Sequence, residues 1–481
     1  MRTILLILFS LLPLLLLSQE NLLIQADSTA NSHLMVVGKI SLEGNRITKP
    51  NIIYREIIIK EGETLTDSIF KIRLEQSRLN LLNTSLFNFV NIDKVADSNG
   101  VINLIFRMTE RWYLFPFPIF EIADRNFNTW IDHRDWRRVN YGGFIKWSNL
   151  RGRMEVLNLL IRFGYDERYR LIYDIPYINS KQTLGLTFLA SINQNHEVAY
   201  KTENNKPLFY RGGNYMLQNY LISTGLNYRP SIFNTYSAAI GYNLFDFDSK
   251  LSELNTSYAP VNANQLKIIK GTLYLRNDHR DSKPYPIKGY FTDVEITSQN
   301  GIYSDNKKYS SNYLYANLIR YNRFNQRWSW SAGTTFKISE NENEPYFLNQ
   351  GLGYRRDYVR GYEYYVIDGG NYFLVRSNIK YNLLKPQIKY LKVTGTEKFD
   401  KIHYTVYCNI FADMGEVFSP IHNDEQSSIM TNTVQMLNNK LLRGIGIGLD
   451  LVTYYDKVLR IEYSVNHFGQ GGFFIHFDSA L

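Results

Sequence analysis

The chain has 481 residues, enough for a large core or two domains, and 15% of them are aromatic, with 37 Tyr and 28 Phe. Because the mean hydropathy is slightly negative, at -0.29, this composition argues against a helical membrane protein and favours a transmembrane β-barrel with aromatic girdles, the alternative being a soluble all-β protein rich in Tyr. The net charge of +9 does not indicate a nucleic-acid binder, since Lys and Arg are spread among Asp and Glu instead of forming a basic stripe.

The chain begins with an export signal. Arg2 supplies a basic residue, residues 4–17 form an apolar run, and Ser18 followed by Gln19 is a plausible cleavage point. The run is short for a transmembrane helix, no cysteine follows it for lipoprotein processing, and no later stretch approaches 18 apolar residues. We therefore expect residues 1–18 to be a signal peptide. In a membrane, the mature chain could then satisfy its backbone groups only as a closed barrel.

Residues 35–110 predict a small α+β domain with the order β-α-α-β-β. Strands are expected at 35–42, 87–95 and 101–109. One helix is expected to be capped by Thr48, with Pro50 just inside its start, and to run to about residue 59. A second helix is expected to be capped by Thr66 or Asp67. The second helix should bury one stripe of residues, Ile69, Ile72, Leu74, Leu79 and Leu82. Any small α+β sandwich would fit this pattern as well.

From Trp112 to the end of the chain, apolar and polar residues alternate. This period of two indicates sixteen strands, an even number, each about as long as a tilted membrane strand needs to be. The strands are expected at residues 112–122, 139–147, 154–164, 168–178, 183–193, 217–228, 235–247, 265–277, 289–298, 312–324, 327–339, 371–383, 404–414, 443–455, 458–468 and 472–481.

The connections between these strands alternate in length. Short turns follow even-numbered strands, and longer polar segments follow odd-numbered ones, at 194–216, 248–264, 340–370 and 415–442. Outer-membrane barrels have this arrangement, with the short turns on the periplasmic side. The connection 385–403 breaks the rule, because it is long and follows the twelfth strand. It indicates either an additional element or an elaborated turn.

The connection between the eleventh and twelfth strands contains Val359, Arg360, Gly361 and Tyr362. A loop of this length tends to have a role of its own or to be disordered. Its many Tyr and Arg residues suggest that it folds into the lumen, where a buried guanidinium needs an anion. Asp413 on the thirteenth strand is the candidate, and the pair could be bidentate. On the tetrapeptide alone, an ordinary solvated arginine is the alternative.

These residues resemble motifs of the POTRA-plus-barrel superfamily, which includes BamA-like and TamA-like assembly factors and two-partner-secretion transporters. That family has V-R-G-[FY] in its sixth extracellular loop and F-x-D-x-G on strand thirteen. The first motif is matched by Val359 to Tyr362, and the second by Phe411, Asp413 and Gly415. Further resemblances lie at residues 83–87, 278–281, 368–371 and 471–477. Residues 371–385 lack the acidic residue that some members place on strand twelve.

The resemblance implies an all-β transmembrane barrel of about sixteen antiparallel strands, with a POTRA-like domain at residues 35–110 and the barrel at 112–481. It implies a location in the outer membrane, with the N-terminal domain in the periplasm. The expected function is assembly, insertion or translocation of client polypeptides, without a cofactor. Unfolded outer-membrane or secreted clients, outer-membrane lipids and accessory lipoproteins are the expected partners, and nucleic acid is not.

In this family, the first and last barrel strands meet at a weak seam that opens laterally. The first strand here carries Pro116 and Pro118, and proline belongs on edge strands because it lacks a ladder donor. The last strand contributes Gly471, Gly472 and Phe477. We therefore expect a short and poorly bonded seam.

Two other functions stay open, namely a dedicated exporter of one partner protein and a passive porin-like channel. An enzyme is not expected, because the sequence has no G-x-S-x-G elbow and no His cluster with metal-ligand spacing. His403, His467 and His476 are scattered along the chain. Cys408 has neither a disulfide partner nor a metal-ligand companion.

Overall fold

The structure is a computed structural model that describes residues 34–97, 100–122, 138–260, 263–340, 344–354, 356–390, 401–418, 437–453 and 457–479. The predicted signal peptide lies outside the described residues. The described chain forms two compact units. One contains residues 34–41, 58–77 and 92–106, and the other contains 42–57, 78–91 and the described residues from 107 onward. Within the described chain, none of the helices combines the length and the apolar character needed to cross a membrane.

The N-terminal elements follow the predicted α+β order, with one short strand added. They are β1 (Leu34–Glu43), α2 (Pro50–Glu56), β2 (Thr64–Thr66), α3 (Asp67–Asn83), β3 (Phe87–Ala96) and β4 (Val101–Glu110). The strands make one sheet in the order β2-β1-β4-β3. Helix α2 ends earlier than predicted, because the β-branched residues Ile57, Ile58 and Ile59 follow it and Ile57 is already extended.

Two details of the predicted helices are wrong. The Thr48 hydroxyl does not cap α2 but donates to Glu110 Oε1 at 2.7 Å, and Lys49 is the N-cap residue. In α3, Phe70 and Leu74 lie on the buried side, whereas Ile69 and Ile72 are 39% and 59% exposed. The buried stripe therefore runs through Phe70 and Leu74 and not through Ile69 and Ile72.

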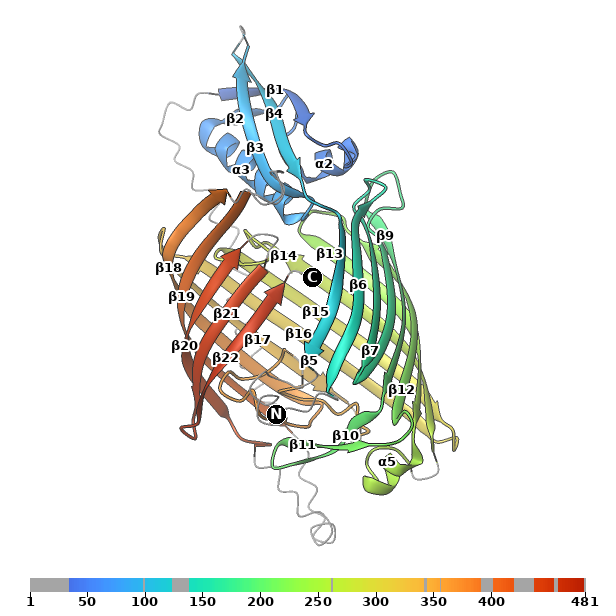
Figure 1. Cartoon of the computed structure of the whole chain (residues 1–481). Helices are drawn as coiled ribbons and strands as arrows, with labels where there is room; N and C mark the ends of the chain where they lie inside the picture. The colour runs from blue at the N-terminus through green and yellow to red at the C-terminus, as the bar shows by residue number, and fades with distance from the viewer. Residues whose placement is uncertain are drawn as a thin grey trace. The chain divides into compact units, whose positions relative to one another are not determined.

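The larger unit contains one antiparallel sheet of sixteen strands that curls into a barrel (Figure 1). The sixteen predicted strands are confirmed, with ends that shift by a few residues. The strands are β5 (Leu114–Ile122), β6 (Val139–Leu150), β7 (Glu155–Gly164), β8 (Asp166–Ile175), β9 (Leu184–Asn195), β12 (Leu217–Tyr228), β13 (Asn234–Phe247), β14 (Gln265–Asp278), β15 (Gly289–Tyr303), β16 (Lys308–Arg323), β17 (Trp328–Ser339), β18 (Asn371–Tyr390), β19 (Lys401–Phe418), β20 (Leu442–Thr453), β21 (Lys457–Asn466) and β22 (Gly471–Ser479).

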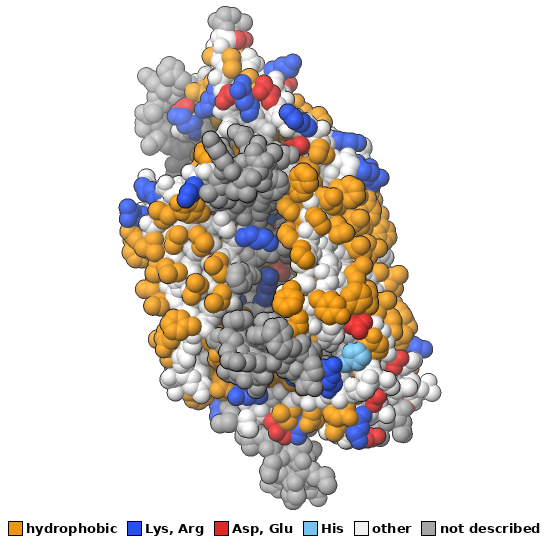
Figure 2. Space-filling view, in the orientation of Figure 1, with side chains coloured by type: hydrophobic (Ala, Val, Ile, Leu, Met, Phe, Trp, Pro, Cys, Tyr) orange, Lys and Arg blue, Asp and Glu red, His pale blue; other side chains and the backbone are white. Residues whose placement is uncertain are grey.

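The alternation of residue types explains which face of each strand points outward. On β20, Ile445 and Ile447 are 63% and 57% exposed, while Asp450 points inward and is fully buried. Figure 2 shows hydrophobic side chains spread over the outer faces of the strands. The polar positions line the lumen, as expected for a barrel whose outer face is apolar.

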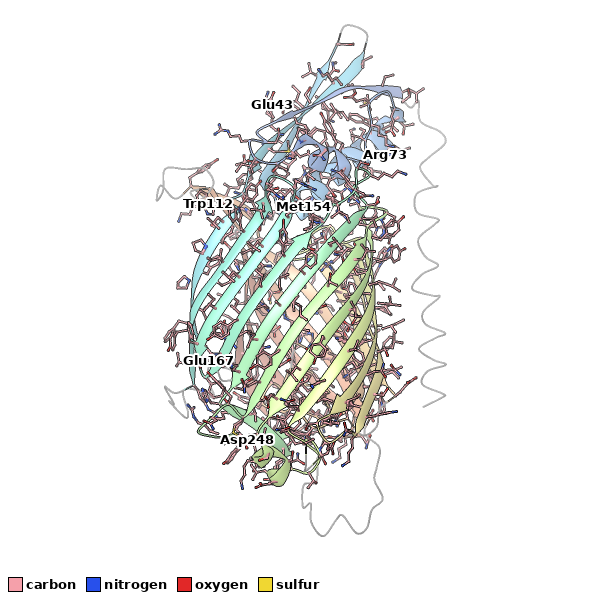
Figure 3. All side chains as sticks on the ribbon, turned by 90° about the vertical axis from the view of Figure 1, so that its right-hand side faces the viewer. Glu43, Arg73, Trp112, Met154, Glu167 and Asp248 are labelled. Atoms are coloured by element: carbon pink, nitrogen blue, oxygen red, sulfur yellow. The ribbon has the colours of Figure 1, made fainter. Side chains whose placement is uncertain are left out.

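The two ends of the barrel differ in the length of their connections. Figure 3 shows Met154, in the turn between β6 and β7, at one end, and Glu167 and Asp248 at the other. We call these the short-turn end and the long-loop end. The long connections contain elements that the sequence pattern did not reveal: the hairpin of β10 (Glu197–Glu203) and β11 (Lys206–Arg211), and the short helix α5 (Ser249–Leu254).

The irregular connection 385–403 is largely a continuation of two barrel strands. β18 extends to Tyr390 and β19 begins at Lys401, and these two residues are register partners. Neighbouring strand β17 pairs with β18 only as far as Tyr381. The additional element is therefore a two-stranded extension at the short-turn end, and residues 391–400 lie outside the described residues.

Candidate functional site: a charged lock in the barrel lumen

The connection between β17 and β18 folds into the barrel instead of remaining in solvent. We call its described residues, 344–354 and 356–370, the lumen loop. Val359 and Tyr362 are buried in one apolar cluster with lumen-facing Leu374, Val417 and Leu442 from three strands. This cluster anchors the loop against the wall formed by β18, β19 and β20.

The structure brings Arg360 of the lumen loop together with Asp413 on β19. Arg360 Nη2 donates to Asp413 Oδ1 at 2.6 Å, and Arg360 Nε donates to Asp413 Oδ2 at 2.7 Å. The Arg360 backbone N–H also donates to Asp413 Oδ2, at 3.2 Å. The guanidinium lies 3.6 Å from the ring centroid of Phe411, in cation–π geometry. Two in-plane bonds and a stacked ring fix the guanidinium in one orientation.

A second carboxylate completes the site. Arg360 Nη1 donates to Glu462 Oε1 on β21 at 3.1 Å and to Asn378 Oδ1 on β18 at 2.9 Å. The side chains of Asp413 and Glu462 are 0% and 1% exposed, and that of Arg360 is 6% exposed. Arg460 Nε lies 3.6 Å from Glu462 Oε1, so negative and positive side chains alternate along the series Asp413, Arg360, Glu462 and Arg460. Because each charge is desolvated, removing one partner would leave its neighbour uncompensated, at a cost of about 3–5 kcal/mol.

Glycines let the loop backbone approach the wall. A Cβ on Gly444 of β20 would lie 1.8 Å from the Arg360 carbonyl oxygen, and one on Gly415 would lie 3.0 Å from Val359 Cγ2. Gly361 has a φ of +94°, a left-handed conformation that glycine adopts at low cost. Gly361 and Gly415 therefore have a steric role next to Arg360.

The lumen loop makes further polar contacts on both sides of Arg360. The Tyr362 hydroxyl is hydrogen-bonded to His467 Nδ1. The Gly361 N–H donates to Glu363 Oε2 at 2.7 Å, but Glu363 Oε1 is buried and has no hydrogen-bond partner within the described residues. Burial raises the pKa of Glu363 from 4.5 to about 7. This carboxyl group therefore titrates near neutral pH.

The β10–β11 hairpin closes over the lumen loop at the long-loop end. The Val366 N–H donates to the Asn205 carbonyl at 2.8 Å, and Asn205 Nδ2 donates to the Val366 carbonyl at 3.3 Å. Thr202 Oγ1 donates to Asp368 Oδ1 at 3.2 Å. The hairpin thus holds the part of the loop that follows the arginine.

A second segment enters the lumen from the short-turn end. At the start of the turn between β14 and β15, Asp278, the last residue of β14, accepts two hydrogen bonds from Arg280, at 2.8 and 2.7 Å. Further along this turn, the Tyr285 hydroxyl donates to Asp450 Oδ2 on β20 at 2.7 Å. Lys380 Nζ lies 4.1 Å from the Tyr285 ring centroid. Segments therefore enter the barrel lumen from both ends.

The predicted seam strands are the two edges of the sheet. The strand order runs from β22 to β5, and no ladder joins these two strands within the described residues. Pro116 and Pro118 lie on β5, opposite Ile145 and Gly143 of β6. Gly471, Gly472 and Phe477 lie on β22, although the side chain of Phe477 is outside the described residues. Figure 2 shows this face hollowed between the two walls, with charged side chains in the opening.

Sequence reasoning did not identify Glu462, Asn378 or Gly444 as parts of the site. A usable signal for Glu462 was the alternation along β21, which puts it on the same face as Arg460. For Gly444, the signal was the Gly-Ile-Gly-Ile-Gly run from residue 444 to residue 448, in which one face of the strand has no side chains. Neither pattern predicts that Glu462 or Gly444 lies next to Arg360.

The comparisons with known proteins come from structure and not from sequence. No protein-family model matches the sequence, and no curated protein matches it. The crystal structure of BamA from Haemophilus ducreyi lacking POTRA domains 1-3 is similar, with a TM-score of 0.50 and 15% identity over 92% of this chain and 84% of that one. CdiB from Escherichia coli is similar with a TM-score of 0.50 and 12% identity, over 92% and 76%. The predicted resemblance to this superfamily is thus confirmed for the fold, and the chain has the barrel fold that BamA and CdiB share.

Proposed function

We propose that the protein is an outer-membrane barrel that assembles, inserts or translocates client polypeptides. Residues 1–18 would be its signal peptide, residues 35–110 a POTRA-like domain in the periplasm, and residues 112–481 the membrane barrel. One observation carries the proposal: an arginine lock, Arg360 with Asp413 and Glu462, holds a loop inside a barrel whose first and last strands are sheet edges.

The edge strands support insertion of clients. An edge strand presents unpaired N–H and C=O groups and can add a strand from another chain. Pro116 and Pro118 remove two donors from β5, which weakens any ladder that β5 forms with β22. A weak ladder can open at low cost, and a client strand can then pair with the exposed edge. Insertion of this kind needs no cofactor and no bond-making chemistry.

The two segments inside the lumen argue against a passive channel. The lumen loop packs its apolar side chains on β18, β19 and β20, and the Tyr285 segment bonds to β20 from the other end. Both segments would obstruct diffusion through an open pore. Single-channel conductance should therefore be low for the intact protein and should rise when residues 344–370 are replaced by a short Gly-Ser linker.

A dedicated exporter is the second candidate, and the polar lumen wall favours it. The loop is held at Arg360 by ion pairs, which can be replaced by water when a polypeptide displaces the loop. Depletion of the protein, followed by a survey of outer-membrane and secreted proteins, separates the two candidates. Loss of many barrel proteins supports general assembly, and loss of one secreted protein supports export. An unchanged survey would refute both.

A further inference from the structure

A cleft of about 280 Å³ opens beside the turn between β16 and β17, at the short-turn end of the barrel. Its walls carry three cationic side chains, Arg323, Arg327 and Lys385, together with Trp328, Asn382 and Tyr407. None of the residues that line it is acidic. The cleft lies apart from the arginine lock, and the proposed mechanism does not use it.

The three cations of the cleft have no counter-ion within the described residues. Arg323 Nε donates to the Asn325 carbonyl at 3.1 Å, and Arg327 Nη1 donates to the Tyr381 hydroxyl at 2.6 Å, so both arginines bond only to neutral groups. Asp281, on the adjacent β14–β15 turn, already accepts backbone N–H bonds from Ser282, Ile287 and Lys288. Like charges gathered in one cleft repel each other, and a bound anion would relieve that repulsion.

Asn382 adds a different requirement. Its backbone N–H donates to the Arg327 carbonyl at 2.8 Å, which holds it against the cationic turn. The residue is 7% exposed, and its side-chain amide is hydrogen-bonded to the Tyr407 hydroxyl. Its Oδ1, in contrast, is buried without a hydrogen-bond partner within the described residues. A buried acceptor without a donor costs about 1–3 kcal/mol. A ligand that suits the whole cleft therefore combines an anion with a hydrogen-bond donor, such as an amine or a hydroxyl.

The cleft borders an exposed aromatic band. Trp328 and Tyr381 contact each other with ring centroids 4.7 Å apart, and Phe324 in the turn is 67% exposed. Trp and Tyr gather where a membrane protein meets the lipid headgroups. An arginine beside interfacial Trp and Tyr rings lies at the depth of the lipid phosphates. Its planar guanidinium can donate two parallel hydrogen bonds to one phosphate.

We propose that this cleft binds a phosphate ester that carries a hydrogen-bond donor, such as a phosphoethanolamine or phosphoglycerol group. Arg323, Arg327 and Lys385 would hold the phosphate, and Asn382 Oδ1 would accept from the amine or hydroxyl. The group can come from a membrane lipid or from a soluble ester. That the ligand is a lipid depends on the proposed outer-membrane location. That the cleft binds a phosphate ester does not depend on it.

The test is calorimetric titration of the full chain, purified in a neutral detergent, with three probes: dihexanoyl phosphatidylethanolamine, O-phosphoethanolamine and inorganic phosphate. We expect at least one ester to bind more tightly than inorganic phosphate. Tighter binding of the lipid than of O-phosphoethanolamine assigns a lipid headgroup, and tighter binding of O-phosphoethanolamine assigns a soluble source. Absence of binding by both esters, or inorganic phosphate binding as tightly as they do, would overturn the proposal.

Variants connect the binding to the cleft. Substitution of all three cations, Arg323→Gln with Arg327→Gln and Lys385→Gln, should weaken ester binding at least tenfold. Lys181→Gln with Lys288→Gln removes exposed cations outside the cleft and should change nothing. Asn382→Leu should abolish the preference for the ester over inorganic phosphate while the chain still folds. Wild-type affinity in the triple variant would refute the site. These titrations use purified protein, so they can fail or succeed independently of the depletion survey.

Discussion

Arg360 and Asp413 form a buried bidentate ion pair that ties the loop after the eleventh barrel strand to the thirteenth strand, with bonds of 2.6 and 2.7 Å. The pair is 53 residues apart in sequence, so the contact joins segments that the chain order separates. A planar guanidinium that is clamped in two directions can occupy only one position. The ion pair therefore specifies one docked position for the loop.

Loss of either partner should undock the loop. Arg360→Ala and Asp413→Ala should each destabilise the barrel, by up to about 3–5 kcal/mol. Arg360→Ala leaves Asp413 and Glu462 buried without the cation they share, and Asp413→Ala leaves Arg360 with one of its two carboxylates. Heat-modifiable gel mobility and thermal unfolding in detergent measure this. Arg276→Ala on β14 is the control, since Arg276 is exposed and its side chain donates to the neutral Tyr274 hydroxyl. Unchanged mobility and melting for both lock variants would contradict the assignment.

The close approach of the lumen loop to Gly444 on β20 should also contribute to the stability of the docked loop. In Gly444→Ala the new Cβ would meet the Arg360 carbonyl at 1.8 Å, so the loop or the strand must shift, at a cost of about 1–3 kcal/mol. Gly271→Ala on β14 is the matched control, because nothing lies within 4 Å of the Cβ position there. Thermal unfolding of both variants provides the test. Equal melting temperatures would show that the close approach at Gly444 is unimportant.

Docking of the lumen loop should depend on pH through Glu363. Burial raises its pKa to about 7 in the docked state, whereas an undocked side chain has the ordinary value of 4.5. The docked state thus binds the proton more tightly. Its stability should be highest below pH 4.5 and should fall as the pH rises through 7, by about 1–2 kcal/mol for a partly exposed group.

Melting temperatures between pH 4.5 and pH 8.5 test this dependence. Glu363→Gln should flatten the slope, because the amide does not ionise. Glu340→Gln is the control, since Glu340 is exposed at the start of the same connection. The same slope in Glu363→Gln as in the wild type would assign the pH dependence to other groups. Glu462 and Arg360 are the charged neighbours to examine next.

The prolines of β5 should keep the seam weak. Pro116 and Pro118 are two positions apart, so both backbone nitrogens point to the same side of the strand. Since β5 pairs with β6 on its other side, Pro116→Val with Pro118→Val would add two donors facing β22. We expect more efficient disulfide trapping between cysteines placed on β5 and β22, in a Cys408→Ser background, and slower client insertion. Trapping and insertion at wild-type levels would exclude this role.

Local patterns in the sequence predicted most of the fold, because a barrel strand has a period of two wherever one face is apolar and the other polar. The same alternation placed residues 340–370 between the eleventh and twelfth strands. It did not reveal the β10–β11 hairpin, whose residues show no long alternating run. Nor did it show that β18 continues past residue 383 to Tyr390, or that β19 begins at Lys401.

The sequence by itself determined the sixteen strands, the position of Arg360 in the long loop and the nature of its first partner, Asp413. Only the tertiary structure decided that Glu462 and Asn378 complete the lock, that Gly444 makes room for it and that a second segment enters from the other end. The physical reason is that alternation along one strand reports only which face a residue occupies. Which residues meet across the lumen depends on strand register, barrel curvature and the path of a loop, and these are properties of the curved sheet as a whole.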